Sequence, residues 1–115
     1  MIGPYFKGVY DRGTVSKLKL NNGECAIVNN GDGSAAHKFE HWLSLFRFNN
    51  VTYMFDSYGR TCDEIDKYFC KLGFVAPKHE QMEGIYSNNC GQIALSAILT
   101  MRIVNPINFF DTYKL

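Results

Sequence analysis

Hydrophobic and polar positions in the middle of the chain follow the pattern of a β-hairpin. Residues 41–48 are strand-like, and residues 51–56 are rich in β-branched and aromatic side chains. The two asparagines between these runs suit a two-residue turn. A short apolar run at residues 25–28, bounded by turn-forming residues, predicts another buried strand. Residues 1–20 mix aromatic side chains with turn formers, which predicts an irregular surface segment.

Helical patterns follow further along the chain. Thr61 and Glu64 have the spacing of a capping box, and the apolar residues after them predict an amphipathic helix over residues 62–72. Residues 90–101 are apolar nearly all round, so they predict a helix buried inside the domain. Residues 74–76 suit a short strand between the two helices. Strands, a helix, a further strand and a buried helix in this order predict the α+β class.

Composition narrows the class of protein. The chain has 115 residues, which suits a single domain, and 46% of them are hydrophobic, which is enough for a core. The net charge of +1 argues against a protein whose main task is to grip nucleic acid. The longest largely apolar stretch, residues 93–101, is about half of the ~20 residues that span a bilayer. The N-terminus lacks the apolar core of a signal peptide, so neither a membrane nor a secretory route is expected.

The four cysteines are Cys25, Cys62, Cys70 and Cys90. Without an export signal, reduced thiols in a cytosolic or nuclear setting are expected. No paired spacing of cysteines and histidines suggests structural zinc, since Cys62 and Cys70 lie eight residues apart. His37 and His41 fall where a loop passes into a strand. No metal and no cofactor are therefore expected.

Cys90 stands at the first turn of the helix predicted over residues 90–101. There the free backbone N–H groups and the positive end of the helix dipole favour the thiolate over the thiol. Gly91 leaves open space around the sulfur. A buried, unreactive cysteine is the alternative interpretation, and for a lone Cys-Gly pair it is the commoner one.

The predicted hairpin brings an imidazole and a carboxylate together. With the two asparagines as the turn, Asp56 faces Leu43, and His41 lies on the same face two residues from Leu43. His41 and Asp56 are then diagonal neighbours, ~7–8 Å apart at the backbone, within reach of a side-chain hydrogen bond. Asp56 would fix the tautomer of the ring and leave the other nitrogen free to act as a base toward a thiol. The alternative is a polar pair on the surface.

His41, Asp56 and Cys90 supply a base, an orienting carboxylate and a nucleophile, a set that is recognised by roles rather than by chain order. Five short segments resemble the adenovirus proteinase (adenain) family in matching order and at similar spacings. They are residues 4–11, 25–29, 41–42, 54–59 and 89–91. The His41-Trp42 pair, the acidic residue closing the next strand and the Cys90-Gly91 pair also resemble the wider clan of ubiquitin-like-protein proteases.

This resemblance implies one cysteine-endopeptidase domain over residues 1–115, with an α+β, papain-type core and the nucleophile on a central helix. His41 would be the general base, Asp56 would orient it, and Cys90 would form an acyl-enzyme. Members of the family cut after glycine in Gly-Gly-like or Gly-x sites and mature virion precursor proteins. The implied partners are viral precursor polypeptides, in the host nucleus or cytoplasm and in the virion.

The resemblance also implies an oxyanion hole. The family places a glutamine six or seven residues before the nucleophile, where this chain has Glu83 or Gly84. Gln81 is the expected replacement, beside the backbone N–H of the nucleophile, because an amide stabilises the developing oxyanion whereas a carboxylate repels it. The alternatives are a solvated Gln81, or Asn88 or Asn89 as the donor.

Substrate contacts and activators follow from the same resemblance. Trp42, Gly91 and Asn89 would line a narrow cleft, although Trp42 suits a core position equally well. Adenovirus enzymes are stimulated by DNA and by a disulfide-linked viral peptide. The charge of +1 gives little support for activation by DNA binding. The corresponding place near His79 has no cysteine to which a peptide could be linked, which leaves Cys70 as a substitute attachment point.

Two other functions remain open at this stage. The first is a non-catalytic relative of the fold that acts as a virion or protein-interaction component, which the short chain and the displaced glutamine favour. The second is an acyltransferase that uses the same triad, although no phosphate-binding Gly-rich loop is present in the sequence.

Overall fold

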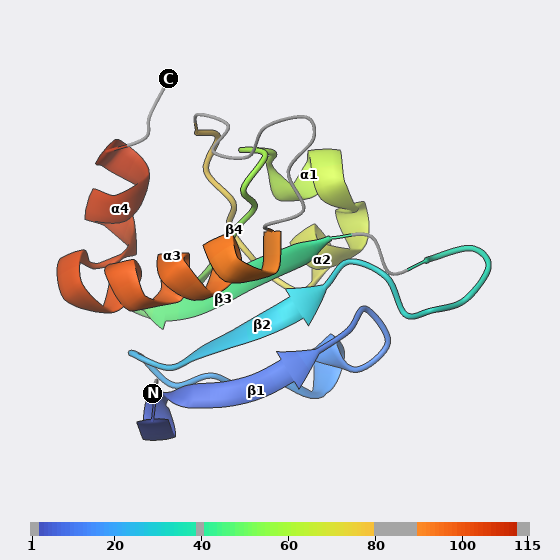
Figure 1. Ribbon diagram of the computed structural model, residues 1–115. Coiled ribbons are helices and arrows are strands. Elements are labelled where there is room, and N and C mark those ends of the chain that lie inside the picture. Colours follow the sequence, from blue (N-terminus) through green and yellow to red (C-terminus); the bar gives the residue numbers. More distant parts are fainter. Residues whose placement is uncertain (1–2, 39–40, 80–89, 113–115) are drawn as a thin grey trace.

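Four strands form one mixed sheet in the order β1, β2, β3, β4 in the computed structural model, which describes residues 3–38, 41–79 and 90–112 (Figure 1). The strands are β1 (Phe6–Tyr10), β2 (Cys25–Asn29), β3 (Trp42–Phe48) and β4 (Val51–Phe55). β1 runs parallel to β2, and the other neighbours are antiparallel. With the helices described below, this sheet confirms the α+β class.

The β3–β4 hairpin forms as the sequence predicts. Asn49 and Asn50 have φ angles of 51° and 65°, the left-handed values that a type I′ turn requires at both central positions. The register pairs Ser44 with Phe55, so the residues after β4 approach the residues before β3. The turn therefore determines what lies together at the far end of the hairpin.

The prediction of an irregular surface segment over residues 1–20 is wrong for residues 6–10, which form strand β1. It pairs with β2, and its side chains alternate between exposed and partly buried. Gly8, which the sequence suggests is a turn residue, lies inside the strand with φ 106°, where the register shifts between Phe6 and Val9. A glycine at such an irregularity is a bulge signal as much as a turn signal. Short 3-10 turns at Gly3–Tyr5 and Val15–Lys17 complete this region.

The single helix predicted over residues 62–72 is divided into α1 (Cys62–Ile65) and α2 (Lys67–Lys71). The capping box is present, since the Thr61 backbone N–H donates to Glu64 Oε1 at 3.0 Å. Asp66 interrupts the helix with an extended backbone, φ −172° and ψ 121°, and caps α2 by accepting from the Tyr68 N–H. The Arg12 guanidinium also donates to Asp66, at 2.7 Å. This contact from a distant segment holds Asp66 in its capping position.

A disulfide joins Cys62 to Cys70, so the expectation of reduced thiols is wrong for this pair. In one continuous helix, eight residues would separate their Cα atoms by ~12 Å, too far for a disulfide. The break at Asp66 folds α2 back and brings the two Cα atoms to 5.6 Å. Cys25 is free and buried in β2.

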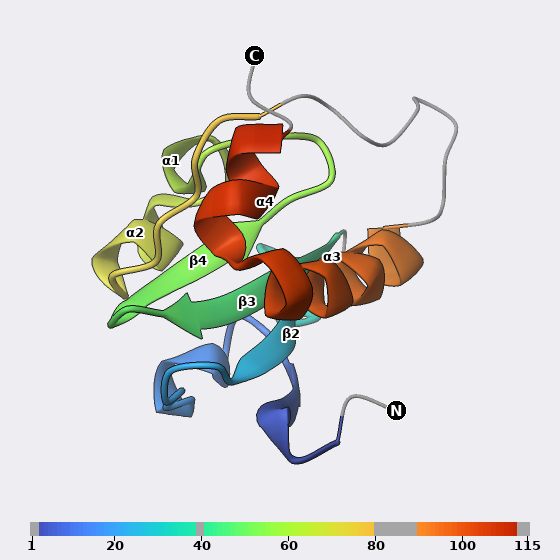
Figure 2. The same cartoon turned by 90° about the vertical axis from the view of Figure 1, so that its left-hand side faces the viewer.

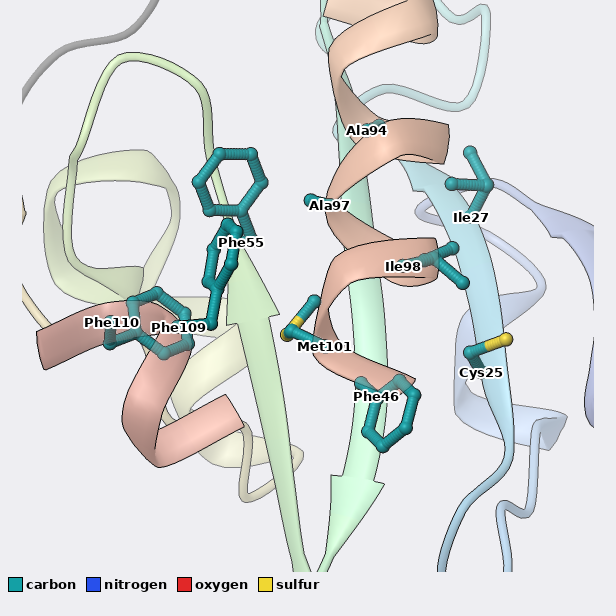
Figure 3. Packing of buried hydrophobic residues seen from close by; sticks show 10 residues of the cluster. All are labelled: Cys25, Ile27, Phe46, Phe55, Ala94, Ala97, Ile98, Met101, Phe109 and Phe110. Carbon is teal, nitrogen blue, oxygen red and sulfur yellow. The ribbon is translucent and has the colours of Figure 1, made fainter. Parts of the chain in front are cut away.

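The longest helix, α3 (Cys90–Val104), packs on one face of the sheet (Figure 3). Its buried side is formed by Ala94, Ala97, Ile98 and Met101. Its opposite side exposes Leu95, Leu99 and Ile103. The helix is therefore buried on one side, not all round as its composition predicts.

A final helix, α4 (Pro106–Thr112), bends away from α3 by 115° (Figure 2). Asn105 between them has φ 63°. Phe109 and Phe110 of α4 contact Phe55, so the helix closes the core beside β4 (Figure 3).

Side-chain alternation in the sheet divides the core between two faces. Ser44 and Phe46 of β3 face α3, while Leu43 and Leu45 pack in the second cluster with Phe69 of α2. The predicted short strand at residues 74–76 is reduced to one bridge between Val75 and Tyr53. Helices α3 and α4 thus cover one face of the sheet, and α1, α2 and the segment around Val15 cover the other.

The orientation of α3 predicts a difference between two isoleucines on the same helix. Ile98→Ala should lower the free energy of unfolding by about 2–5 kcal/mol, because Ile98 is fully buried and its loss leaves a cavity. Ile103→Ala should change it by less than ~0.5 kcal/mol, because Ile103 is 84% exposed. Urea unfolding followed by circular dichroism measures both values. Equal losses in the two variants would contradict the packing of α3.

Candidate active site

His41 and Asp56 form a buried hydrogen bond at the open end of the β3–β4 hairpin. His41 Nε2 lies 2.5 Å from Asp56 Oδ1. The exposed fractions are 5% for His41 and 0% for Asp56, so the alternative of a surface polar pair is wrong. The predicted diagonal approach of the two residues is confirmed.

The Asp56 carboxylate accepts four hydrogen bonds. Oδ1 accepts from His41 and from the Tyr58 backbone N–H, and Oδ2 accepts from the Arg60 side chain at 2.7 Å and from the Arg60 backbone N–H. Burial alone would raise the pKa of Asp56, but the bonds from His41 and Arg60 outweigh it and hold the pKa at about 2. Asp56 is therefore a carboxylate near neutral pH.

The rest of the His41 environment fixes the ring in place. Its backbone is tied to Asn30, whose N–H donates to the His41 carbonyl at 3.1 Å and whose Oδ1 accepts from the His41 N–H at 3.0 Å. The Tyr58 ring lies 4.9 Å from the imidazole, and Ser57 Oγ lies 3.4 Å from Nε2. With ionised Asp56 as the acceptor, Nε2 carries the proton, and Nδ1 keeps the lone pair of a base.

The first turn of α3 lies over the start of β3 (Figure 1). A Cβ placed on Gly91 would lie 3.5 Å from Trp42 Cδ1, and the buried Ser44 Oγ donates to the Ala94 carbonyl at 2.6 Å. Trp42 and Ser44, two residues apart on β3, thus both approach the helix whose first residue is Cys90. The Cys90 side chain, Gln81 and Asn89 lie outside the described residues.

A groove of about 560 Å³ opens next to this junction. Its lining is mainly apolar and comes from β1, β2, β3 and α3, namely Phe6, Val9, Ile27, Trp42, Gly91, Gln92 and Leu95. Trp42 is half-buried, lines the groove and also packs against the core cluster of α3, so both interpretations of this residue remain predictions. An extended peptide could lie here with apolar side chains against the wall.

The sequence patterns assign no site role to Tyr58 or Arg60, because Tyr58 counts only within the segment 54–59 and Arg60 follows directly after it. The structure places both beside the His41–Asp56 pair, with the Arg60 guanidinium 5.3 Å from the centre of the Tyr58 ring. The available signal was an arginine four residues after an aspartate, with a glycine between them. Gly59 has φ 75°, the turn that returns Arg60 to Asp56.

Over the described ranges, no three metal-ligating side chains lie close enough to hold an ion. In the same ranges no single helix has the length and hydropathy to cross a membrane, although α3 from Gly91 and α4 together pass that test as a bent pair.

No protein-family model matches the chain, and a search of curated proteins also finds no match. The resemblance to adenain-type proteases therefore rests on the five sequence segments alone.

The low pKa of Asp56 predicts a loss of stability in acid. Asp56 is fully ionised above the pKa of ~3.9 that an unfolded chain gives it, and it becomes protonated in the folded protein only near pH 2. Its contribution to the free energy of unfolding should therefore fall by about 2 kcal/mol between about pH 5 and about pH 2. Asp56→Asn should lack this part of the pH dependence. Urea unfolding at several pH values measures the difference, and parallel curves for the two proteins would contradict it.

Proposed function

We propose that this protein is a cysteine endopeptidase in which His41, Asp56 and Cys90 act as base, orienting residue and nucleophile. The observation that carries the proposal is the buried bond from His41 Nε2 to Asp56, because it leaves Nδ1 as the basic nitrogen. The start of α3 beside Trp42 supports it, since Cys90 begins that helix.

The proposed reaction uses each group in turn. His41 Nδ1 takes the proton of the Cys90 thiol, and the resulting imidazolium is stabilised by Asp56. The thiolate attacks the scissile carbonyl, and the oxyanion accepts a bond from the Cys90 backbone N–H and from Gln81 as the expected second donor. The imidazolium then protonates the leaving amine. His41 finally removes a proton from a water molecule that hydrolyses the acyl-enzyme.

The proposed substrates are viral precursor polypeptides cut after glycine, as the resemblance to the adenain family implies. The apolar groove supports peptide binding, with Trp42 and Gly91 close enough that a side chain at position 91 would meet the indole. Asn89 is proposed as a further substrate contact. The proposed compartments are the host nucleus or cytoplasm and the virion.

Activation by a disulfide-linked peptide through Cys70 is not proposed, because the Cys70 sulfur is already bonded to Cys62. A peptide or DNA activator of another kind would need its own binding surface. The net charge of +1 still gives little support for DNA.

Alkylation tests the nucleophile directly. Without reductant, iodoacetamide near neutral pH should label Cys90 much faster than Cys25. Cys62 and Cys70 are protected by their disulfide, and burial raises the pKa of Cys25 to about 11. Peptide mapping by mass spectrometry identifies the labelled residue, and labelling that spares Cys90 in the folded protein would contradict the proposal.

Cleavage of a Gly-Gly-containing peptide provides the matching activity assay. Cys90→Ala should abolish cleavage, whereas Cys25→Ala should retain it, because Cys25 lies in the core away from the proposed chemistry. Cleavage that survives Cys90→Ala would refute the assignment. A folded protein that binds the peptide without cutting it would favour the non-catalytic alternative.

The groove predicts different effects for two leucines that are similarly exposed on α3. Leu95→Glu should raise KM for a peptide with apolar residues beside the glycine by about tenfold, because Leu95 lines the groove and the change removes apolar contact. Leu99→Glu, one turn further along α3 and outside the groove lining, should leave KM nearly unchanged. Steady-state kinetics measures both, and equal increases would show that the groove does not bind the peptide.

A further inference from the structure

Arg60, which follows β4, contacts the two side chains that hold the His41 ring, Asp56 and Tyr58. Its Nε donates to Asp56 Oδ2 at 2.7 Å, and its guanidinium carbon lies 5.3 Å from the centre of the Tyr58 ring. The Tyr58 ring in turn lies 4.9 Å from the imidazole of His41. Four side chains therefore form a ring in which each contacts the next: His41, Asp56, Arg60 and Tyr58.

The bond from Arg60 determines which way the carboxylate is turned. Each oxygen of Asp56 accepts from one side chain and one backbone N–H, with His41 on Oδ1 and Arg60 on Oδ2. Without the Arg60 side chain, Oδ2 would keep only the bond from the backbone N–H of residue 60, at 3.3 Å. The carboxylate could then rotate about its χ2 bond, and the direction of the bond to Nε2 would be less well defined.

Arg60 also balances charge around a group that has no contact with water. Asp56 is 0% exposed, and among the described residues the charged or titratable groups that act on it are His41, directly before β3, and Arg60. The Arg60 side chain is 35% exposed, so its own charge stays partly solvated. The guanidinium thus helps keep Asp56 ionised without being buried itself.

A similar arrangement occurs elsewhere in the described part of the chain, without a hydrogen bond from a histidine to the aspartate. Arg12 Nε donates to Asp66 Oδ2 at 2.7 Å, and its guanidinium lies 4.6 Å from the centre of the Tyr68 ring. There the aspartate caps a helix. An arginine, an aspartate and a tyrosine alone are therefore a structural unit, and the bond to His41 is what distinguishes the unit at Arg60.

We propose that Arg60 is a positioning residue for the His41–Asp56 pair, holding the carboxylate so that Oδ1 receives the Nε2 proton and holding Tyr58 against the imidazole. The effect of Arg60 on catalysis rests on the proposed endopeptidase function. Its effect on the Asp56 carboxylate does not depend on that function, so the two effects can be tested separately.

Carbon-13 NMR of the aspartate carboxyl groups tests the contact in Arg60→Met, Arg60→Lys and Arg12→Met. Arg60→Met should raise the pKa of Asp56 by about one unit or more, and Arg60→Lys should raise it less because the positive charge remains. Arg12→Met is the matched control. It should raise the pKa of Asp66, whose bond to Arg12 lowers it, and leave the titration of Asp56 unchanged.

Peptide cleavage tests the consequence for catalysis. Arg60→Met should lower kcat by about 10- to 100-fold with little change in KM, and Arg60→Lys should recover part of the loss. Unchanged Asp56 titration or unchanged kcat in Arg60→Met would overturn the proposal. If the unaltered protein cuts no peptide while Arg60→Met still shifts Asp56, the endopeptidase function fails and the positioning of Asp56 by Arg60 stands.

Discussion

The register of the β3–β4 hairpin constrains everything that follows at the site. Two asparagines in left-handed conformation pair Ser44 with Phe55, and this pairing brings Asp56 to His41. Because side chains alternate along a strand, a shift of one residue would place the two groups on opposite faces of the sheet. The buried carboxylate is then stable because four donors compensate for the loss of water.

A second constraint sets where α3 begins. The helix buries one apolar side against the sheet, and a hydrogen bond from Ser44 to the Ala94 carbonyl fixes its position along β3. A Cβ at position 91 would lie in ordinary van der Waals contact with Trp42, so the first turn of the helix and the indole are neighbours. The helix start and the tryptophan thus meet beside an apolar groove, and His41 is the residue directly before Trp42 in the chain.

Local patterns in the sequence predict the elements whose stability is local. The hairpin, the strand at Cys25–Asn29, the capping box of Thr61 and the helix beginning at Cys90 all carry their own signals. The approach of His41 to Asp56 follows from the hairpin register, so it could also be predicted.

Features that depend on distant contacts could not be predicted in this way. The break in the helix at Asp66 depends on Arg12, which is 54 residues away, and the Cys62–Cys70 disulfide depends on that break. The role of Arg60 could not be predicted because it depends on how the turn at Gly59 returns the side chain to Asp56. The exposed side of α3 was mistaken for a buried one because composition does not show which neighbours a helix has.

The distance from Cys90 Sγ to His41 Nδ1 tests the proposed triad most directly. A high-resolution crystal structure of the protein gives it. A separation of about 3–4 Å, with the sulfur open to the groove, is the predicted result. A sulfur on the far side of the sheet from the imidazole, beyond the reach of any side-chain rotation, would contradict the proposed chemistry.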